Sequence, residues 1–187
     1  MAKRKKIEVV LPVRLSDMIE KSREMTKDEF ARFYIGSDFL VSTSAQTADS
    51  INMGLKTLTK QDVFSEDKEK EQFVYELPWE HIDLSGPKYG NKLWVGRYSN
   101  PPIVLAIANP NISRLQGYFM KARGELSFTD ADSSNGTFID KEKLTPLEKA
   151  VLQEGSILHF GKTDIHLIFY TPQGVINYLR SQWHKGK

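Results

Sequence analysis

The chain contains the sequence Asp132-Ser133-Ser134-Asn135-Gly136-Thr137-Phe138-Ile139, a polar turn that leads directly into a short apolar stretch. Gly136 has no Cβ and can therefore take a positive φ, which a tight Asn-Gly turn requires. Residues 137–139 are of types that favour strands. The segment predicts a tight turn followed at once by a strand.

Short strand candidates surround this turn from residue 72 onward, and Gly, Pro, Asn or Asp separates many of them. Ile165, Leu167 and Phe169 alternate with His166 and Ile168, which predicts a strand with one face more deeply buried than the other. Many short strands separated by turn residues favour a β-sandwich. The candidates are residues 73–75, 93–95, 103–108, 118–120, 126–128, 137–139, 156–160 and 165–170.

Three further segments accompany the Asn-Gly turn in a fixed order. They are Val95-Gly96-Arg97, Asn111-Ile112-Ser113-Arg114-Leu115-Gln116 and Glu154-Gly155-Ser156-Ile157-Leu158-His159-Phe160-Gly161. With residues 132–139 they resemble the forkhead-associated (FHA) domain family, whose pattern is a Gly-Arg at a strand end, a Ser-Arg-x-His loop and a Ser-Ser-Asn-Gly-Thr run. The resemblance covers residues 93–170 and implies an eleven-stranded sandwich that binds phosphothreonine peptides on the loops at one end.

The resemblance also implies a role for each of five residues. Ser113 would donate its hydroxyl to the phosphate, and Arg97 and Arg114 would supply guanidinium donors, which suits a dianionic ligand. Asn135 would hold the peptide main chain, and Ser134 would lie beside the phosphothreonine. These residues are the predicted phosphopeptide-binding site.

The sequence departs from the family pattern at Gln116, where the family has His. That His buttresses the phosphate loop through hydrogen bonds. Gln can also donate and accept hydrogen bonds, but it copies neither the shape nor the charge of imidazole. Gly117 replaces a small apolar residue, and Pro101-Pro102 replace a polar segment after the Gly-Arg.

Helical segments are expected on both sides of the sandwich. Apolar residues at three-to-four spacing predict helix over residues 13–35, and capping-box spacing at Thr26 predicts a second helix from Lys27 to near Gly36. A short strand at residues 39–41 and a loop or linker at 42–70 follow. Thr171-Pro172 predicts the start of a terminal helix. We expect an N-terminal helical extension and linker at 1–70, and an FHA-like β-sandwich with a terminal helix at 71–187, similar to a bacterial FHA subgroup.

Composition limits the class of protein. The sequence has no Cys, which excludes disulfides and Cys-ligated zinc. No run approaches the ~20 apolar residues of a membrane span, so we expect a cytoplasmic protein. Residues 3–6 form a basic run. Residues 84–124 carry six cations and no acid, and this window is either a solvated basic face or the receiver of an anion.

Two functions remain open on the sequence alone. The first is a phosphothreonine-dependent adaptor in Ser/Thr kinase signalling, and the second is an interaction module that keeps the FHA fold but binds partners without phosphate. Nucleic-acid binding is disfavoured and would predict a steep loss of affinity with salt. The four His residues are scattered without the spacing of metal ligands, and no nucleophile–base motif is present, so we expect neither a cofactor nor enzyme activity.

Overall fold

A computed structural model describes residues 10–43, 46–47, 70–80, 83–85, 87, 89–97, 103–107 and 109–183. Several predictions fall outside these residues. They concern the basic run at 3–6, most of the predicted linker, Lys88, Pro101-Pro102, His81 and His184.

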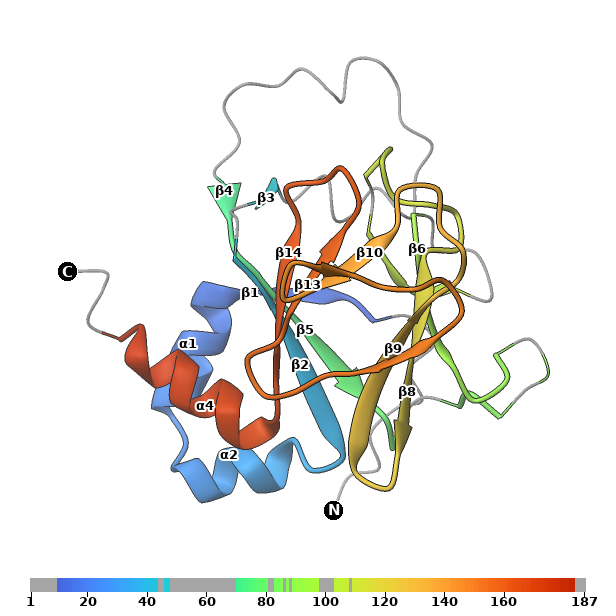
Figure 1. The fold of residues 1–187 in the computed structure, drawn as a ribbon. Helices are drawn as coiled ribbons and strands as arrows, with labels where there is room; N and C mark the ends of the chain where they lie inside the picture. The colour runs from blue at the N-terminus through green and yellow to red at the C-terminus, as the bar shows by residue number, and fades with distance from the viewer. Residues whose placement is uncertain are drawn as a thin grey trace.

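Two sheets form the body of the molecule (Figure 1). The seven-stranded sheet has the order β1-β5-β2-β14-β13-β10-β11, and the five-stranded sheet has the order β12-β9-β8-β6-β7. The bounds in the first sheet are β1 Pro12–Arg14, β2 Ser37–Ser42, β5 Phe73–Pro78, β10 Thr137–Ile139, β11 Glu142–Lys143, β13 Ile157–Phe160 and β14 His166–Tyr170. Those in the second are β6 Leu93–Gly96, β7 Ile103–Ala106, β8 Gly117–Ala122, β9 Glu125–Asp130 and β12 Lys149–Val151, and β3 (Gln46–Thr47) pairs separately with β4 (Lys70–Glu71).

The main core lies between the two sheets. Phe128 of β9 contacts Phe119 of β8 and Phe160 of β13, with ring centroids 4.8 Å and 5.9 Å apart. All three rings are fully buried. Along β14, Leu167 and Phe169 point into this core while His166, Ile168 and Tyr170 are only partly buried, which confirms the predicted alternation. The predicted mainly β sandwich is confirmed.

Three helices cover the outer face of the seven-stranded sheet, on the left of Figure 1. They are α1 (Leu15–Arg23), α2 (Lys27–Phe33) and α4 (Pro172–Ser181). Both predicted caps are present: Thr26 accepts from Glu29 N in a capping box, and Thr171 accepts from Gly174 N. Within the described residues, no helix is long and apolar enough to cross a membrane.

The strand β2 connects the N-terminal segment to the sandwich. It lies between β5 and β14 and pairs antiparallel with both, and all six of its residues are buried. The predicted division between residues 70 and 71 therefore cuts across one sheet. The division stays a prediction, and the pairing of β2 argues against it.

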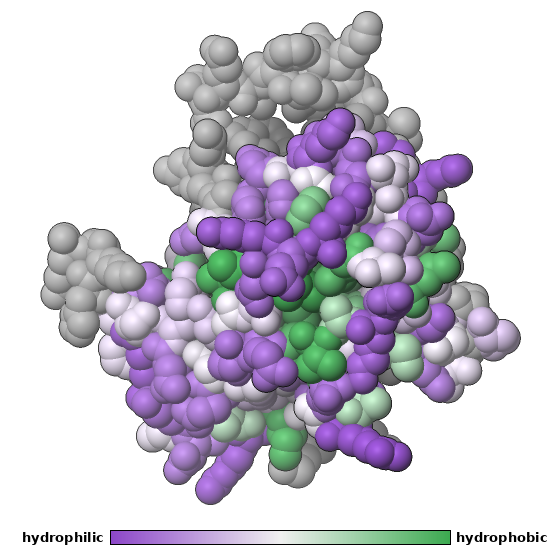
Figure 2. Space-filling model, in the orientation of Figure 1, coloured by the Kyte–Doolittle hydropathy of each residue, from purple (hydrophilic) through white to green (hydrophobic). Residues whose placement is uncertain are grey.

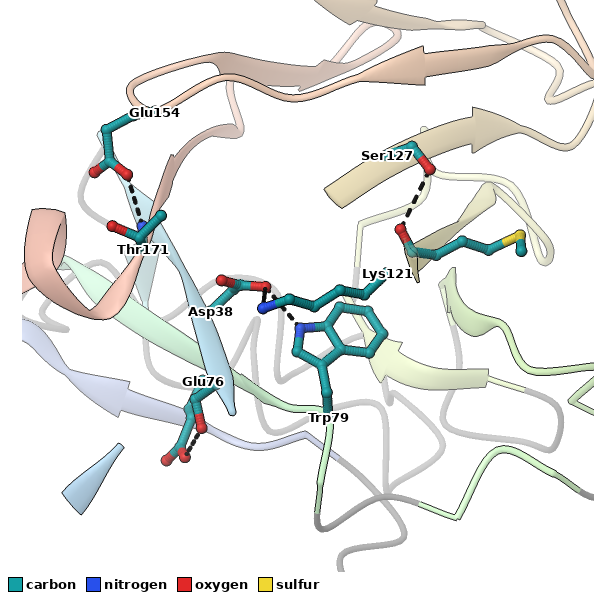
Figure 3. Close-up of polar contacts among 9 residues, drawn as sticks. Asp38, Glu76, Trp79, Lys121, Ser127, Glu154 and Thr171 are labelled. Carbon is teal, nitrogen blue, oxygen red and sulfur yellow. Dashed lines mark hydrogen bonds and ion pairs between the residues drawn. The ribbon is translucent and has the colours of Figure 1, made fainter. Parts of the chain in front are cut away.

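A buried carboxylate joins the two sheets, near the start of β2 and the end of β8 (Figure 3). Asp38 of β2 lies 2.7 Å from Nζ of Lys121 on β8 and accepts a hydrogen bond of 2.8 Å from the indole of Trp79.

The other cations of the window 84–124 lie elsewhere. Lys92 lies over the Trp94 and Tyr118 rings, and Arg123 is in the turn between β8 and β9. The basic window of residues 84–124 is therefore divided among several places and is not one face.

Tyr75 of β5 offers a test of the core. Its side chain is fully buried between the sheets, and its hydroxyl has no hydrogen-bond partner among the described residues. Replacing Tyr75 with Phe should raise the free energy of unfolding by about 1 kcal/mol, because an unpaired buried hydroxyl is removed. Urea denaturation measures this gain, and an equal or lower stability would indicate that the hydroxyl is satisfied.

The same residue gives a dependence on pH. Burial raises the pKa of Tyr75 above its ordinary value of 10.0. The unfolded chain then loses the phenolic proton before the folded chain does, so stability present below pH 10 is lost as the pH rises. The advantage of Tyr75→Phe over the unaltered protein should grow by about 1.4 kcal/mol between pH 9 and pH 11. A stability difference that stays constant between pH 9 and pH 11 would contradict the raised pKa of Tyr75.

Candidate functional site

Three loops gather at one end of the sandwich, at the top of Figure 1 and opposite the β8–β9 turn. The β7–β8 loop carries Ser113, the β9–β10 loop carries Ser134 and Asn135, and residues 161–165 connect β13 to β14. Hydrogen bonds link the β7–β8 loop to each of the other two. Residues far apart in the sequence therefore form one surface.

Ser113 and Ser134 meet across two of these loops. The backbone N of Ser134 donates to Oγ of Ser113 at 3.0 Å, and the two hydroxyl oxygens are 3.4 Å apart. The backbone N of Arg97 donates to the carbonyl of Ser113 at 3.1 Å, which fixes the end of β6 against the same loop. The two serines thus present hydroxyl and amide groups at one point.

The two predicted arginines have different environments. Arg97 is half-buried, and its Nη1 donates to the carbonyl of Pro110 at 3.1 Å. Arg114 is exposed, and no described residue forms a hydrogen bond or ion pair with its side chain. Arg97 is held beside the Ser113 loop, whereas Arg114 can move toward a ligand.

Asn135 is fixed by contacts on either side. Its Nδ2 donates to the carbonyl of Asn111 at 2.8 Å, and Asn111 in turn donates to the carbonyl of Lys162 at 3.3 Å. Gly161 adjoins Asn135 so closely that a Cβ there would collide with the Cβ of Asn135. Gly136 has a φ of 77°, as the Asn-Gly turn requires.

Gln116 holds the β7–β8 and β9–β10 loops together. It is only 1% exposed, and its Oε1 accepts from the backbone N of Ser113 at 3.0 Å. Its Nε2 donates to the Ser133 hydroxyl at 2.7 Å, the Gly136 carbonyl at 3.1 Å and the Thr137 hydroxyl at 3.0 Å. The amide therefore serves as the buttress that the family forms with His.

Asp130, at the end of β9, fixes the direction of these hydrogen bonds. The hydroxyls of Ser133 and Thr137 both donate to its Oδ2, and the backbone N of Ser133 donates to Oδ1 at 2.8 Å. Because each hydroxyl has one proton and gives it to Asp130, its lone pairs face Gln116. A buried carboxylate thus orients the acceptors that the amide needs.

The sequence model of the FHA domain family matches residues 93–161, which contain β6 to β13 and the loops that carry all five predicted residues. Residues 93–161 therefore carry the sequence pattern of an FHA domain. No curated protein matches the chain. The match to residues 93–161 confirms the predicted family resemblance.

Solved FHA domains are among the similar structures. The MEK1 FHA domain in complex with the HOP1 pThr318 peptide is 21% identical with a TM-score of 0.37, and the match covers 42% of this chain and 78% of that one. The FHA domain of a hypothetical protein from Arabidopsis thaliana is 17% identical with a TM-score of 0.46, over 73% of this chain and 86% of that one. The N-terminal FHA domain of S. cerevisiae Rad53p, in complex with a phosphothreonine peptide, is 18% identical with a TM-score of 0.39, over 46% and 73%.

The structure brings the predicted site residues to one end of the FHA domain and adds others. Asn111 and Asp130 were not predicted. The carbonyl of Asn111 accepts from Asn135, and Asp130 accepts from Ser133 and Thr137, two of the partners of Gln116. An Asn at the start of the Ser113 loop and an Asp at a strand end are common loop residues, so neither carried a distinctive signal. Gln116 was noted as a departure, but its four partners could not be identified from the sequence.

Proposed function

We propose that the chain binds phosphothreonine peptides at the loop end of its FHA domain. The observation that carries this proposal is the meeting of Ser113 Oγ with the Ser134 backbone N, with Arg114 next to Ser113 in the sequence and the Arg97 backbone bonded to the Ser113 carbonyl. The serine hydroxyl and the arginine side chains are the donors that a phosphate dianion requires. Gln116 supports the proposal because it keeps the loop buttressed without the family His.

The hydroxyl of Ser113 can serve the phosphate without breaking its loop contact. Its oxygen accepts from Ser134 N, while its proton has only the 3.4 Å approach to Ser134 Oγ within the described residues. Rotation of that proton toward a phosphate oxygen costs little, because 3.4 Å is long for an O–H···O hydrogen bond. The loop conformation is thus prepared for the ligand.

The expected binding free energies indicate that Asn135 also contributes to peptide binding. Each charge-assisted hydrogen bond contributes about 1.5–3 kcal/mol. Three such hydrogen bonds roughly equal the ~8 kcal/mol binding free energy of a micromolar complex. The entropy lost when the peptide and the loops become ordered must still be subtracted from that sum. We therefore expect Asn135 to add contacts to the peptide main chain, and flanking residues of the peptide to set its specificity.

We propose further that the protein acts by binding alone, as a cytoplasmic adaptor in a pathway whose Ser/Thr kinase is a separate protein. The domain belongs to a family of binding modules.

Calorimetric titration with a degenerate phosphothreonine peptide pool tests the proposal. The phosphorylated pool should bind and its unphosphorylated twin should not. Ser113→Ala and Arg114→Ala should each weaken binding at least about tenfold, because each removes a charge-assisted hydrogen bond. Arg123→Ala, in the β8–β9 turn at the other end, is the matched control and should bind as the unaltered protein does. Equal binding of both pools would overturn the proposal.

Phosphate-independent binding is the second candidate, and exposed apolar side chains favour it. Figure 2 shows hydrophobic areas near the middle of one face, separated by hydrophilic side chains. Leu147, Val151 and Ile157 are 71%, 38% and 38% exposed and belong to one segment of the chain. A partner that binds equally with and without phosphate, and loses affinity on Leu147→Ser, would favour this candidate.

A further inference from the structure

Two aromatic side chains lie next to each other on the outer face of the five-stranded sheet. Trp94 of β6 and Tyr118 of β8 are direct cross-strand partners, and their ring centroids are 4.8 Å apart. The residues beside them in the sequence, Leu93, Val95 and Phe119, belong to the core between the sheets. The three described helices all pack on the other sheet, so none of them covers the two rings (Figure 1).

Lys92 places a positive charge on this aromatic pair. Its Nζ lies 4.1 Å from the centroid of the Tyr118 ring and 5.4 Å from that of the Trp94 ring, as in a cation–π interaction. No described residue forms an ion pair with this ammonium group, whereas Lys121 on the next strand pairs with Asp38. The rings hold the cation in place, so an anionic partner would lose little entropy in ordering it.

The strands that form this part of the face contain no acidic residue. The strands β6, β7 and β8 all lie within residues 84–124, which have six cations and no Asp or Glu. The neighbouring strand β9 has two acids, but Glu125 pairs with Lys149, and Asp130 accepts hydrogen bonds from the loop that follows it. These four strands therefore supply no carboxylate to Lys92.

An apolar side chain extends the surface beyond the aromatic pair. Met120 lies on the same face of β8 and is 36% exposed. On β9, the cross-strand partners of these β8 residues are Thr129 and Ser127, which are each only 4% exposed. Met120 thus stands above a row of small side chains. Trp, Tyr and Met are enriched where proteins bind one another.

From these observations we propose that the outer face of β6 and β8 binds an acidic segment of a partner protein. A carboxylate of that segment would pair with Lys92, and an apolar side chain beside it would pack on Tyr118 and Met120. The inference does not use the phosphothreonine site, so it stands or falls separately from the proposed function.

A nucleic acid fits this face less well than an acidic peptide does. The ammonium group of Lys92 lies over the two rings on which bases would otherwise stack. A single lysine also neutralises only one phosphate, whereas the affinity of nucleic-acid-binding proteins comes from several such contacts. One carboxylate with an apolar neighbour matches one cation beside an apolar surface.

Selection from a phage-displayed library of random, unphosphorylated peptides tests the inference, with the full chain as the target. We expect the selected peptides to share an Asp or Glu next to an aromatic or aliphatic residue. In calorimetric titration with a selected peptide, Lys92→Gln and Met120→Ser should each lower the affinity about fivefold. Lys92→Glu should lower it further, because it places two negative charges together.

Two controls separate this face from other sites. Lys141→Gln removes the same charge in the β10–β11 turn of the other sheet and should bind the peptide as the unaltered protein does. Ser113→Ala should also leave the affinity unchanged. A peptide that loses affinity in Ser113→Ala but keeps it in Lys92→Gln occupies the phosphate loops and overturns the inference.

Three other results would overturn the proposal while the proposed function stands. They are the selection of no peptide, the selection of peptides without acidic residues, and full affinity in Lys92→Gln. Single-stranded oligothymidylate is titrated in parallel. If it binds, loses affinity in Lys92→Gln and falls steeply in affinity with salt while no acidic peptide binds, the face is a nucleic-acid site and the peptide proposal is wrong. Acidic peptides that require Lys92 support the proposal even if no phosphopeptide binds.

Discussion

Replacing Gln116 with Met is expected to abolish measurable phosphopeptide binding and to lower the free energy of unfolding by about 3 kcal/mol. Met has a similar length and is unbranched, so the substitution removes the polar atoms of the side chain with little change in volume. The buried amide makes four hydrogen bonds, and its loss leaves the Gly136 carbonyl and the Ser113 backbone N without their partner. Calorimetric titration measures the binding, and urea denaturation measures the stability.

The loss of binding follows from the positions of the partners. The amide oxygen of Gln116 holds the Ser113 loop, and its amide nitrogen holds the loop that contains Ser134 and Asn135. Without this link the two loops can separate, and Ser113 Oγ no longer lies opposite Ser134 N. The phosphate donors would then have to be ordered at the expense of binding energy.

Two control variants separate the role of the amide from a general loss of stability. Gln116→His restores the family residue, whose neutral ring has one donor and one acceptor, and it should keep binding within about tenfold of the unaltered protein. Gln153→Met changes an exposed glutamine and should change neither quantity. Full phosphopeptide affinity in a folded Gln116→Met protein would show that the loops do not depend on the amide.

Much of the sandwich could be predicted because its signals are local. The strand candidates, the Thr26 and Thr171 caps and the Asn135-Gly136 turn each depend on residues adjacent in the sequence. The strands β11 and β12 were not predicted, because they are two and three residues long and largely exposed. Such strands have neither an apolar alternation nor a buried run to identify them.

The arrangement of the site could be predicted only in part. The resemblance indicated Ser113 and Asn135, but three of the four contacts of Gln116 join residues 17 to 21 positions apart and depend on how two loops meet. The pairing of β6 with β8, which brings Trp94 beside Tyr118, was likewise indicated by no sequence pattern. The arrangement of the site therefore depends on pairings between strands and loops, which the local sequence motifs do not indicate.

A fragment of residues 71–187 is expected to remain unfolded. It lacks β2, which pairs with β14 on one side and with β5 on the other, so the fragment has no strand to join these two. Phe39, Leu40 and Val41 are fully buried, and burial of three such side chains contributes about 6 kcal/mol. That amount is comparable with the whole stability of a typical domain.

Circular dichroism and urea denaturation of the fragment measure the outcome. A fragment of residues 10–187 keeps every described element, and it should unfold cooperatively with nearly the stability of the full chain. Cooperative unfolding of residues 71–187 would instead show that β5 and β14 can form a sheet without β2, and that a domain boundary lies near residue 70. Because β2 supplies residues to both clusters of buried side chains, Leu40 to the core between the sheets and Phe39 and Val41 to the layer under the helices, its removal disrupts both sides of the sheet together.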